Sequence, residues 1–86
     1  MSDQIQAELA KRRRQEDIIA EVLHERVRQD RQWGGPEHDD THSADDFAMF
    51  IRRQANRLHE DPRGRMVKIA ALAVAAVEML DRELER

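Results

Sequence analysis

Four side chains with complementary chemistry lie close together just before the first glycine of the sequence. Arg26, Arg28 and Gln29 precede Trp33 by one or two turns if this stretch is a helix. A guanidinium group binds phosphate through two parallel hydrogen bonds, and an indole ring offers a face for stacking. The combination favours a phosphorylated ligand that carries a ring. In the alternative interpretation, Trp33 closes the core and the arginines pair with acidic side chains.

A second polar group follows the helix-breaking residues Gly34 to Pro36. His38, Asp39, Asp40 and His42 are all metal-ligand types, but two histidines four apart in a predicted loop need not share a face. Hydrogen bonding and helix capping within the turn is the alternative. We place His38 and Asp39 in the candidate ligand site and assign no metal to this turn.

Two pairs of carboxylates have helical spacing. Glu21 and Glu25 are four residues apart, and Glu78 and Asp81 are three apart. Two helices that each present such a pair can hold Mg²⁺, which prefers oxygen ligands. The alternative is that these side chains form ion pairs with neighbouring arginines. Glu78 interrupts an apolar run, so a buried carboxylate there needs a cationic partner.

Composition limits the remaining possibilities. A chain of 86 residues is one small domain, and the absence of cysteine excludes disulfides and thiolate metal sites. The basic run Lys11–Arg14 has acidic neighbours and the net charge is −3, so nucleic acid is an unlikely partner. The sequence has no apolar stretch long enough to cross a bilayer. We therefore expect no membrane partner and a cytoplasmic location.

Apolar periodicity predicts three helices. The first begins after Ser2 and either runs unbroken to about Gln32 or starts near Gln15 behind an arm of about residues 1–14. The second begins at Ser43, a capping residue, and ends near Glu60. The third follows residues 61–64 and continues to the C-terminus.

The third helix has apolar side chains around most of its circumference. Its narrow remaining strip contains Ala71 and Ala75 between charged residues. Two short neighbouring helices cannot cover so much apolar surface. We therefore predict a homo-oligomer with this helix at its centre.

Three segments, at residues 22–34, 38–40 and 70–82, resemble small phage-encoded proteins related to the MazG-like all-α nucleotide pyrophosphohydrolases. The resemblance extends over about residues 18–82. It implies paired helices that assemble into dimers or larger oligomers. It also implies Mg²⁺ held by an EExxE and an ExxD motif, and a nucleoside triphosphate substrate.

The acidic motifs of that family are replaced in this chain. The stretch that corresponds to the family's EExxE motif reads RRQAN at residues 52–56. The start of the third helix, which corresponds to the ExxD motif, reads RMVK at residues 65–68. Arg52, Arg53 and Lys68 in place of carboxylates would attract phosphate directly, without a metal. This favours binding without hydrolysis.

The sequence thus predicts an all-α homo-oligomer of MazG-like helical hairpins that binds a nucleotide-like phosphorylated ligand, uses no cofactor and does not hydrolyse it. Sequestering a host-defence nucleotide signal in the cytoplasm of a phage host is one such use. The predicted ligand-binding residues are Arg26, Gln29, Trp33, His38, Asp39, Arg52, Arg53 and Lys68.

Two alternatives stay open. In the first, the protein is a Mg²⁺-dependent nucleoside triphosphate pyrophosphohydrolase that uses Glu21, Glu25, Glu78 and Asp81. In the second, it is an interaction protein, for example an inhibitor, with no small ligand.

Overall fold

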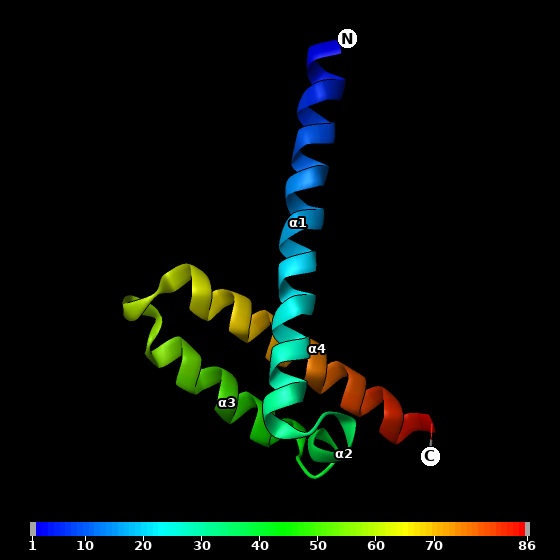
Figure 1. Cartoon of the computed structure of the whole chain (residues 1–86), viewed down its shortest axis with the longest axis vertical. Helices are drawn as coiled ribbons and strands as arrows, with labels where there is room; N and C mark the ends of the chain where they lie inside the picture. The colour runs from blue at the N-terminus through cyan, green and yellow to red at the C-terminus, as the bar shows by residue number, and fades with distance from the viewer. Residues whose placement is uncertain (1, 86) are drawn as a thin grey trace.

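Helices form every regular element of the structure. The computed structural model describes residues 2–85 (Figure 1). The elements are α1 (Ser2–Trp33), α2 (Pro36–Asp39), α3 (Ala44–Asn56), the short 3-10 helix η1 (Leu58–Glu60) and α4 (Pro62–Glu85). The all-α class is therefore confirmed, with three corrections. The predicted loop after Pro36 contains the short helix α2, and the second predicted helix ends at Asn56, with a 3-10 turn to Glu60. The third predicted helix begins at Pro62, inside the stretch expected to precede it.

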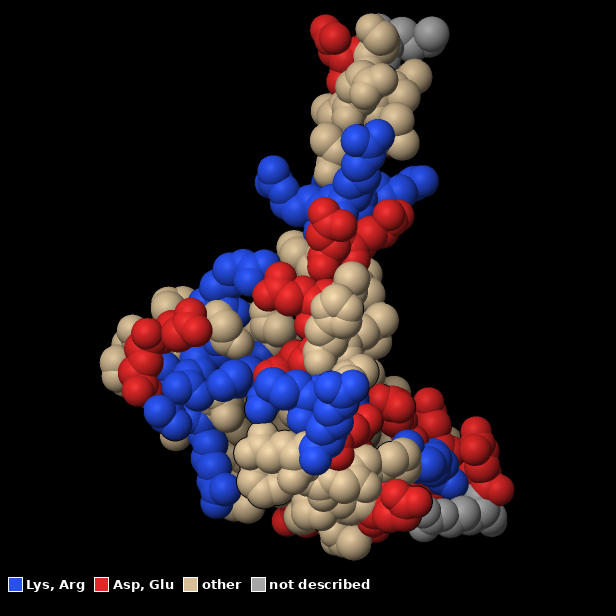
Figure 2. Space-filling view, viewed as in Figure 1, with Lys and Arg blue, Asp and Glu red and all other residues tan. Residues whose placement is uncertain are grey.

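The first helix is continuous and extends far beyond the others. It contains neither glycine nor proline, and it is rich in residues that favour helix. Its C-terminal half packs on α4, whereas residues 2–20 are all exposed and project away from the other helices (Figure 1). The exposed run Lys11–Arg14 makes a basic band around this projecting half, next to Glu16 and Asp17 (Figure 2).

Two glycines end α1 and reverse the chain. Gly34 and Gly35 have φ angles of 106° and 72°, which side chains with a Cβ rarely adopt. The Gly34 amide still donates a hydrogen bond to the Asp30 carbonyl at 2.8 Å, and Pro36 follows at the start of α2. The turn places α2 against α4.

A capping box fixes the start of α3, as the sequence predicts. The Asp46 amide donates to Oγ of Ser43 at 3.2 Å, and the Ser43 amide donates to the Asp46 carboxylate at 3.0 Å. The hydrogen bond from the Ser43 amide holds the pKa of Asp46 below its ordinary value. This start directs Phe47 and Phe50 toward α4.

The core lies between α3 and α4. Phe47, Ala75 and Met79 are at most 2% exposed, and Phe50 and Leu72 pack against them. The prediction that Ala71 and Ala75 form a subunit contact is wrong. They are 0% and 2% exposed because the chain's own helices cover them.

Other apolar residues of α4 remain exposed: Met66, Val77, Leu80 and Leu84. Within residues 2–85, none of the helices has the length and apolar character required to cross a membrane.

Met79 is the largest fully buried side chain. We expect Met79→Ala to lower the free energy of unfolding by about 2–5 kcal/mol, because it removes buried apolar surface and leaves a cavity. Met66 lies on the same helix and is 53% exposed, so Met66→Ala should change the free energy of unfolding by less than about 0.5 kcal/mol. Urea unfolding monitored by circular dichroism measures both. Equal losses in the two variants would contradict the assignment of the core.

Candidate functional site

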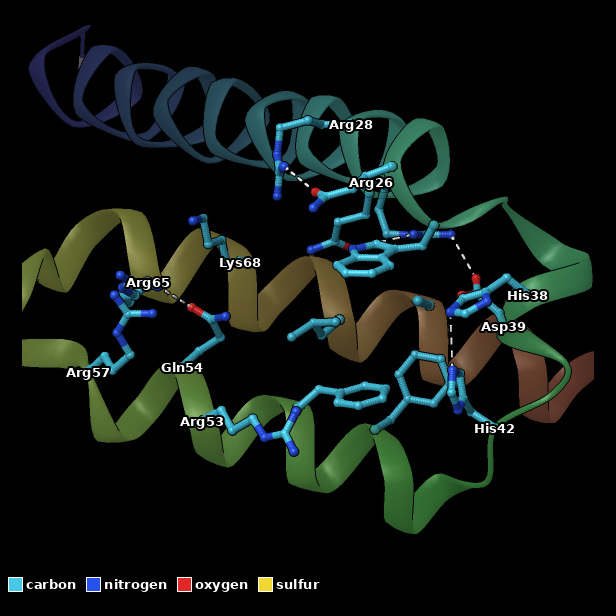
Figure 3. Close-up of a pocket in the computed structure, with 17 residues that line it drawn as sticks. Arg26, Arg28, His38, Asp39, His42, Arg53, Gln54, Arg57, Arg65 and Lys68 are labelled. Atoms are coloured by element: carbon cyan, nitrogen blue, oxygen red, sulfur yellow. Dashed lines mark hydrogen bonds and ion pairs between the residues drawn. The ribbon is translucent and has the colours of Figure 1, made fainter.

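A cavity of about 630 Å³ lies between α1, α3 and α4 and extends to the turn that contains α2 (Figure 3). Its walls come from segments that are far apart in the sequence. The lining residues are Arg26, Arg28, Gln29, Gln32, Trp33, His38, Asp39, His42, Phe47, Phe50, Arg53, Gln54, Arg57, Arg65, Lys68, Leu72 and Ala75.

Aromatic rings line the end of the cavity near α2. Trp33 stacks on His38 with centroids 6.2 Å apart and planes 20° apart, and the Trp33 ring remains 56% exposed. His42 contacts the edge of His38 at 4.8 Å and of Phe50 at 5.2 Å. Phe47 and Phe50 meet edge to face at 5.9 Å. This end can therefore receive a planar ring.

Cationic side chains line the opposite end. In Figure 3, Arg57, Arg65 and Lys68 lie toward this end, whereas Arg53 on α3 lies nearer the aromatic rings, with its guanidinium carbon 6.0 Å from the centroid of the Phe50 ring. Arg65 donates a hydrogen bond to the neutral amide of Gln54 at 2.8 Å, and Arg57 pairs with Glu60 at 2.7 Å.

Three of these cations form no close ion pair. Arg53, Arg65 and Lys68 have no carboxylate of residues 2–85 within ion-pair distance. Arg65 lies near enough to Glu60 to help lower the pKa of that carboxyl. The cationic partner that Glu78 was predicted to need is Arg26, at 3.3 Å, and not Lys68.

The charge of the lining is opposite in sign to that of the chain. Six lining side chains are cationic and only one, Asp39, is a carboxylate, although the whole chain has a net charge of −3. Arg28, Arg53 and Arg57 are exposed and are partly screened by water, whereas Arg65 and Lys68 are half-buried and are screened less. The arrangement therefore attracts anions toward Arg53, Arg65 and Lys68.

Arg26 is a structural cation rather than a free one. Its guanidinium group lies 3.1 Å from Asp30, 3.5 Å from Asp39 and 3.3 Å from Glu78, and it also contacts Gln29 at 3.5 Å. The residue is only 7% exposed. These contacts correspond to the alternative in which Arg26 pairs with acidic side chains, and a role of Arg26 in ligand binding stays a prediction.

Asp39 is held beneath the cavity surface by Arg26. Its Oδ2 atom is buried and accepts no hydrogen bond from the residues that the structure describes, and it lies 3.5 Å from Nη2 of Arg26. Burial raises the pKa of Asp39, while the nearby Arg26 opposes this rise. Asp39 therefore acts as a counter-charge for Arg26.

His38 and His42 face one another through their Nε2 atoms, 3.2 Å apart (Figure 3). Nδ1 of His42 lies 3.6 Å from the Asp46 carboxylate. Since one imidazole must donate and the other accept, this contact orients both rings at the aromatic end of the cavity.

The carboxylates of the magnesium alternative are dispersed over the molecule. Glu21 forms a two-point ion pair with Arg63 at 2.6 and 2.8 Å, which lowers the pKa of Glu21. Glu25 pairs with Arg28 at 2.7 Å. Asp81 is exposed. Between Ser2 and Glu85 there is no group of three or more acidic or histidine side chains able to hold a metal ion.

Seven of the eight predicted site residues line this one cavity. The exception is Arg52, which is exposed and outside the lining, whereas its neighbour Arg53 is part of it. Arg57 and Arg65 were missed. Helical spacing gave a signal for both, since Arg65 precedes Lys68 by three residues and Arg57 follows Arg53 by four.

Comparisons with known proteins give no family assignment: no family model matches the chain, and no curated protein or solved structure is significantly similar to it. The functional argument therefore depends on the geometry of the cavity.

The ion pairs of Arg26 predict a stability effect. Arg26→Gln should lower the free energy of unfolding by about 3 kcal/mol, at the lower end for a buried pair because Asp30 and Glu78 keep contact with water. Arg28→Gln, at an exposed pair, should cost less than about 1 kcal/mol. Thermal and urea unfolding of both variants measure the difference.

The pH dependence of the Arg26 effect has a definite sign. A carboxyl whose pKa is raised on folding destabilises the folded state while it is ionised, and this cost disappears as the pH falls through the raised pKa. Arg26 stabilises the ionised form of Asp39, so loss of Arg26 increases the free-energy cost of keeping Asp39 ionised in the folded state. The stability difference between wild type and Arg26→Gln should therefore shrink on acidification through that pKa. A difference that grows instead would contradict the role given to Asp39.

Proposed function

We propose that this protein binds a phosphorylated, ring-bearing ligand of the nucleotide type in the cavity between α1, α3 and α4, and does not hydrolyse it. The observation that carries the proposal is a cavity with aromatic rings at one end and, elsewhere in its lining, three cations, Arg53, Arg65 and Lys68, that form no ion pair with a carboxylate of residues 2–85.

The ligand's groups match the two ends. Its ring stacks at the end formed by Trp33 and His38, and its phosphate lies among Arg53, Arg65 and Lys68. A volume of about 630 Å³ is in the range of pockets that hold small ligands.

The MazG-like resemblance and the use of the ligand as a host-defence signal remain predictions. Both are compatible with this pocket, but the ligand class is inferred from the lining residues without them. The interaction-protein alternative is supported by a separate observation, the exposed apolar residues of α1.

Neighbouring arginines on α3 provide a matched test of the ligand site. We expect Arg53→Gln and Lys68→Gln to weaken binding of nucleotides by about tenfold or more, because each loses a charge-assisted contact with phosphate. Arg52→Gln removes the same charge one residue away and outside the cavity, so affinity should stay within about twofold.

Calorimetry with nucleosides and with mono-, di-, tri- and cyclic nucleotides measures these affinities, and quenching of Trp33, the only tryptophan, reports the stacked ring. Inorganic phosphate serves as the ring-free control. Equal effects of Arg52→Gln and Arg53→Gln, or no binding of any nucleotide to the wild type, would refute the proposal.

We also expect no release of pyrophosphate from nucleoside triphosphates with Mg²⁺ or Mn²⁺. Glu21, Glu25 and Glu78 are each engaged with a different arginine, and the cavity lining supplies a single carboxylate. A sensitive assay for pyrophosphate measures this. Release that is abolished in Glu78→Gln would instead establish the enzyme alternative.

A further inference from the structure

A stripe of side chains on the projecting half of α1 has the spacing of a coiled-coil seam. Successive members are separated by four, three, four, three and four residues. The four apolar members are 40–58% exposed. The stripe consists of Ile5, Leu9, Arg12, Glu16, Ile19 and Leu23.

The chain itself does not cover this stripe. The buried residues of α1 are Val22, Arg26 and Gln29, and α1 packs on α4. At about 100° per residue, the stripe is centred roughly a quarter-turn away from that buried face. Figure 1 shows the N-terminal half of α1 extending well clear of α3 and α4. Because helices in water gain most of their stability from packing, this half needs a partner.

The two charged members at the centre of the stripe determine which partner fits. In a parallel pair of α1 helices, Arg12 would lie beside Arg12 and Glu16 beside Glu16, placing like charges in the seam. In an antiparallel pair that is symmetric about Arg14, each Arg12 lies opposite a Glu16.

The same antiparallel arrangement places every apolar residue of the stripe opposite another apolar residue. Ile5 lies opposite Leu23, and Leu9 lies opposite Ile19, on both sides of the central ion pairs. The stripe is therefore complementary to itself in both charge and apolar pattern.

We propose that this stripe is the docking surface for a second copy of the chain, and that two α1 helices form an antiparallel coiled coil with reciprocal Arg12–Glu16 pairs. Since α4 packs on the C-terminal half of α1, the two helical bodies lie at opposite ends of the coil. The cavity is lined by α1 residues from Arg26 onward, beyond the seam, so the dimer and the proposed ligand site are independent.

Charge reversal at the centre of the seam tests the surface. Sedimentation equilibrium of the full chain should show a dimer at micromolar concentration. Arg12→Glu and Glu16→Arg should each weaken it by about tenfold or more, because they place like charges in the seam. The double variant Arg12→Glu/Glu16→Arg should restore the dimer. Arg14→Glu makes the same charge change on the opposite side of α1 and should leave dimerisation unchanged.

Disulfide cross-linking tests the direction, since the chain has no cysteine of its own. An oxidised mixture of Leu9→Cys and Ile19→Cys chains should form a mixed dimer, whereas Leu9→Cys alone should not cross-link. Cross-linking of Leu9→Cys alone would show a parallel pair and overturn the proposal.

A monomeric wild type at these concentrations, or equal losses in Arg14→Glu and Arg12→Glu, would also overturn the proposal. Circular dichroism confirms that each variant is helical. Nucleotide titration of Arg12→Glu separates this proposal from the ligand site, because Arg12 is far from the cavity lining and its loss should leave ligand affinity unchanged.

Discussion

The buried guanidinium group of Arg26 holds the molecule together at the point where its segments meet. It contacts Asp30 on its own helix, Asp39 on α2 and Glu78 on α4. A buried cation is costly unless carboxylates surround it, so this cluster requires the turn after Trp33 to fold back onto α4. The left-handed glycines Gly34 and Gly35 make that return possible. The contact with Asp39 also holds α2, and with it His38, at the aromatic end of the cavity.

The same cluster explains the electrostatic character of the cavity. Arg26 pairs with Asp39, the only carboxylate among the lining residues, and with Glu78, which interrupts the apolar run of α4. Arg53, Arg65 and Lys68 are left with no carboxylate of residues 2–85 within ion-pair distance. A chain with a negative net charge thus forms a cavity that favours anions, because its acids are engaged elsewhere. Charge at a site is set by which ion pairs the fold allows, not by the total composition.

α1 serves two purposes on two faces. The face with Val22, Arg26 and Gln29 is buried and supports the ion-pair cluster and the cavity. The face with Leu9 and Ile19 is exposed and matches a second α1 in antiparallel register. Ala71 and Ala75 are covered within the chain, so the predicted strip of α4 is not available to a second copy.

Local sequence determined the helices and their ends. Periodicity, the Ser43 capping residue and the glycine pair act within a few residues, so they could be predicted from neighbouring side chains alone. Helical spacing allowed the cationic residues of the site near Lys68 to be predicted in part. Only the tertiary structure decided which cations are free, since ion pairs such as Arg26–Glu78 and Arg63–Glu21 join residues 52 and 42 positions apart. The same long-range packing assigned Arg53 to the cavity and Arg52 to the surface, because one residue of helix rotates a side chain by about 100°.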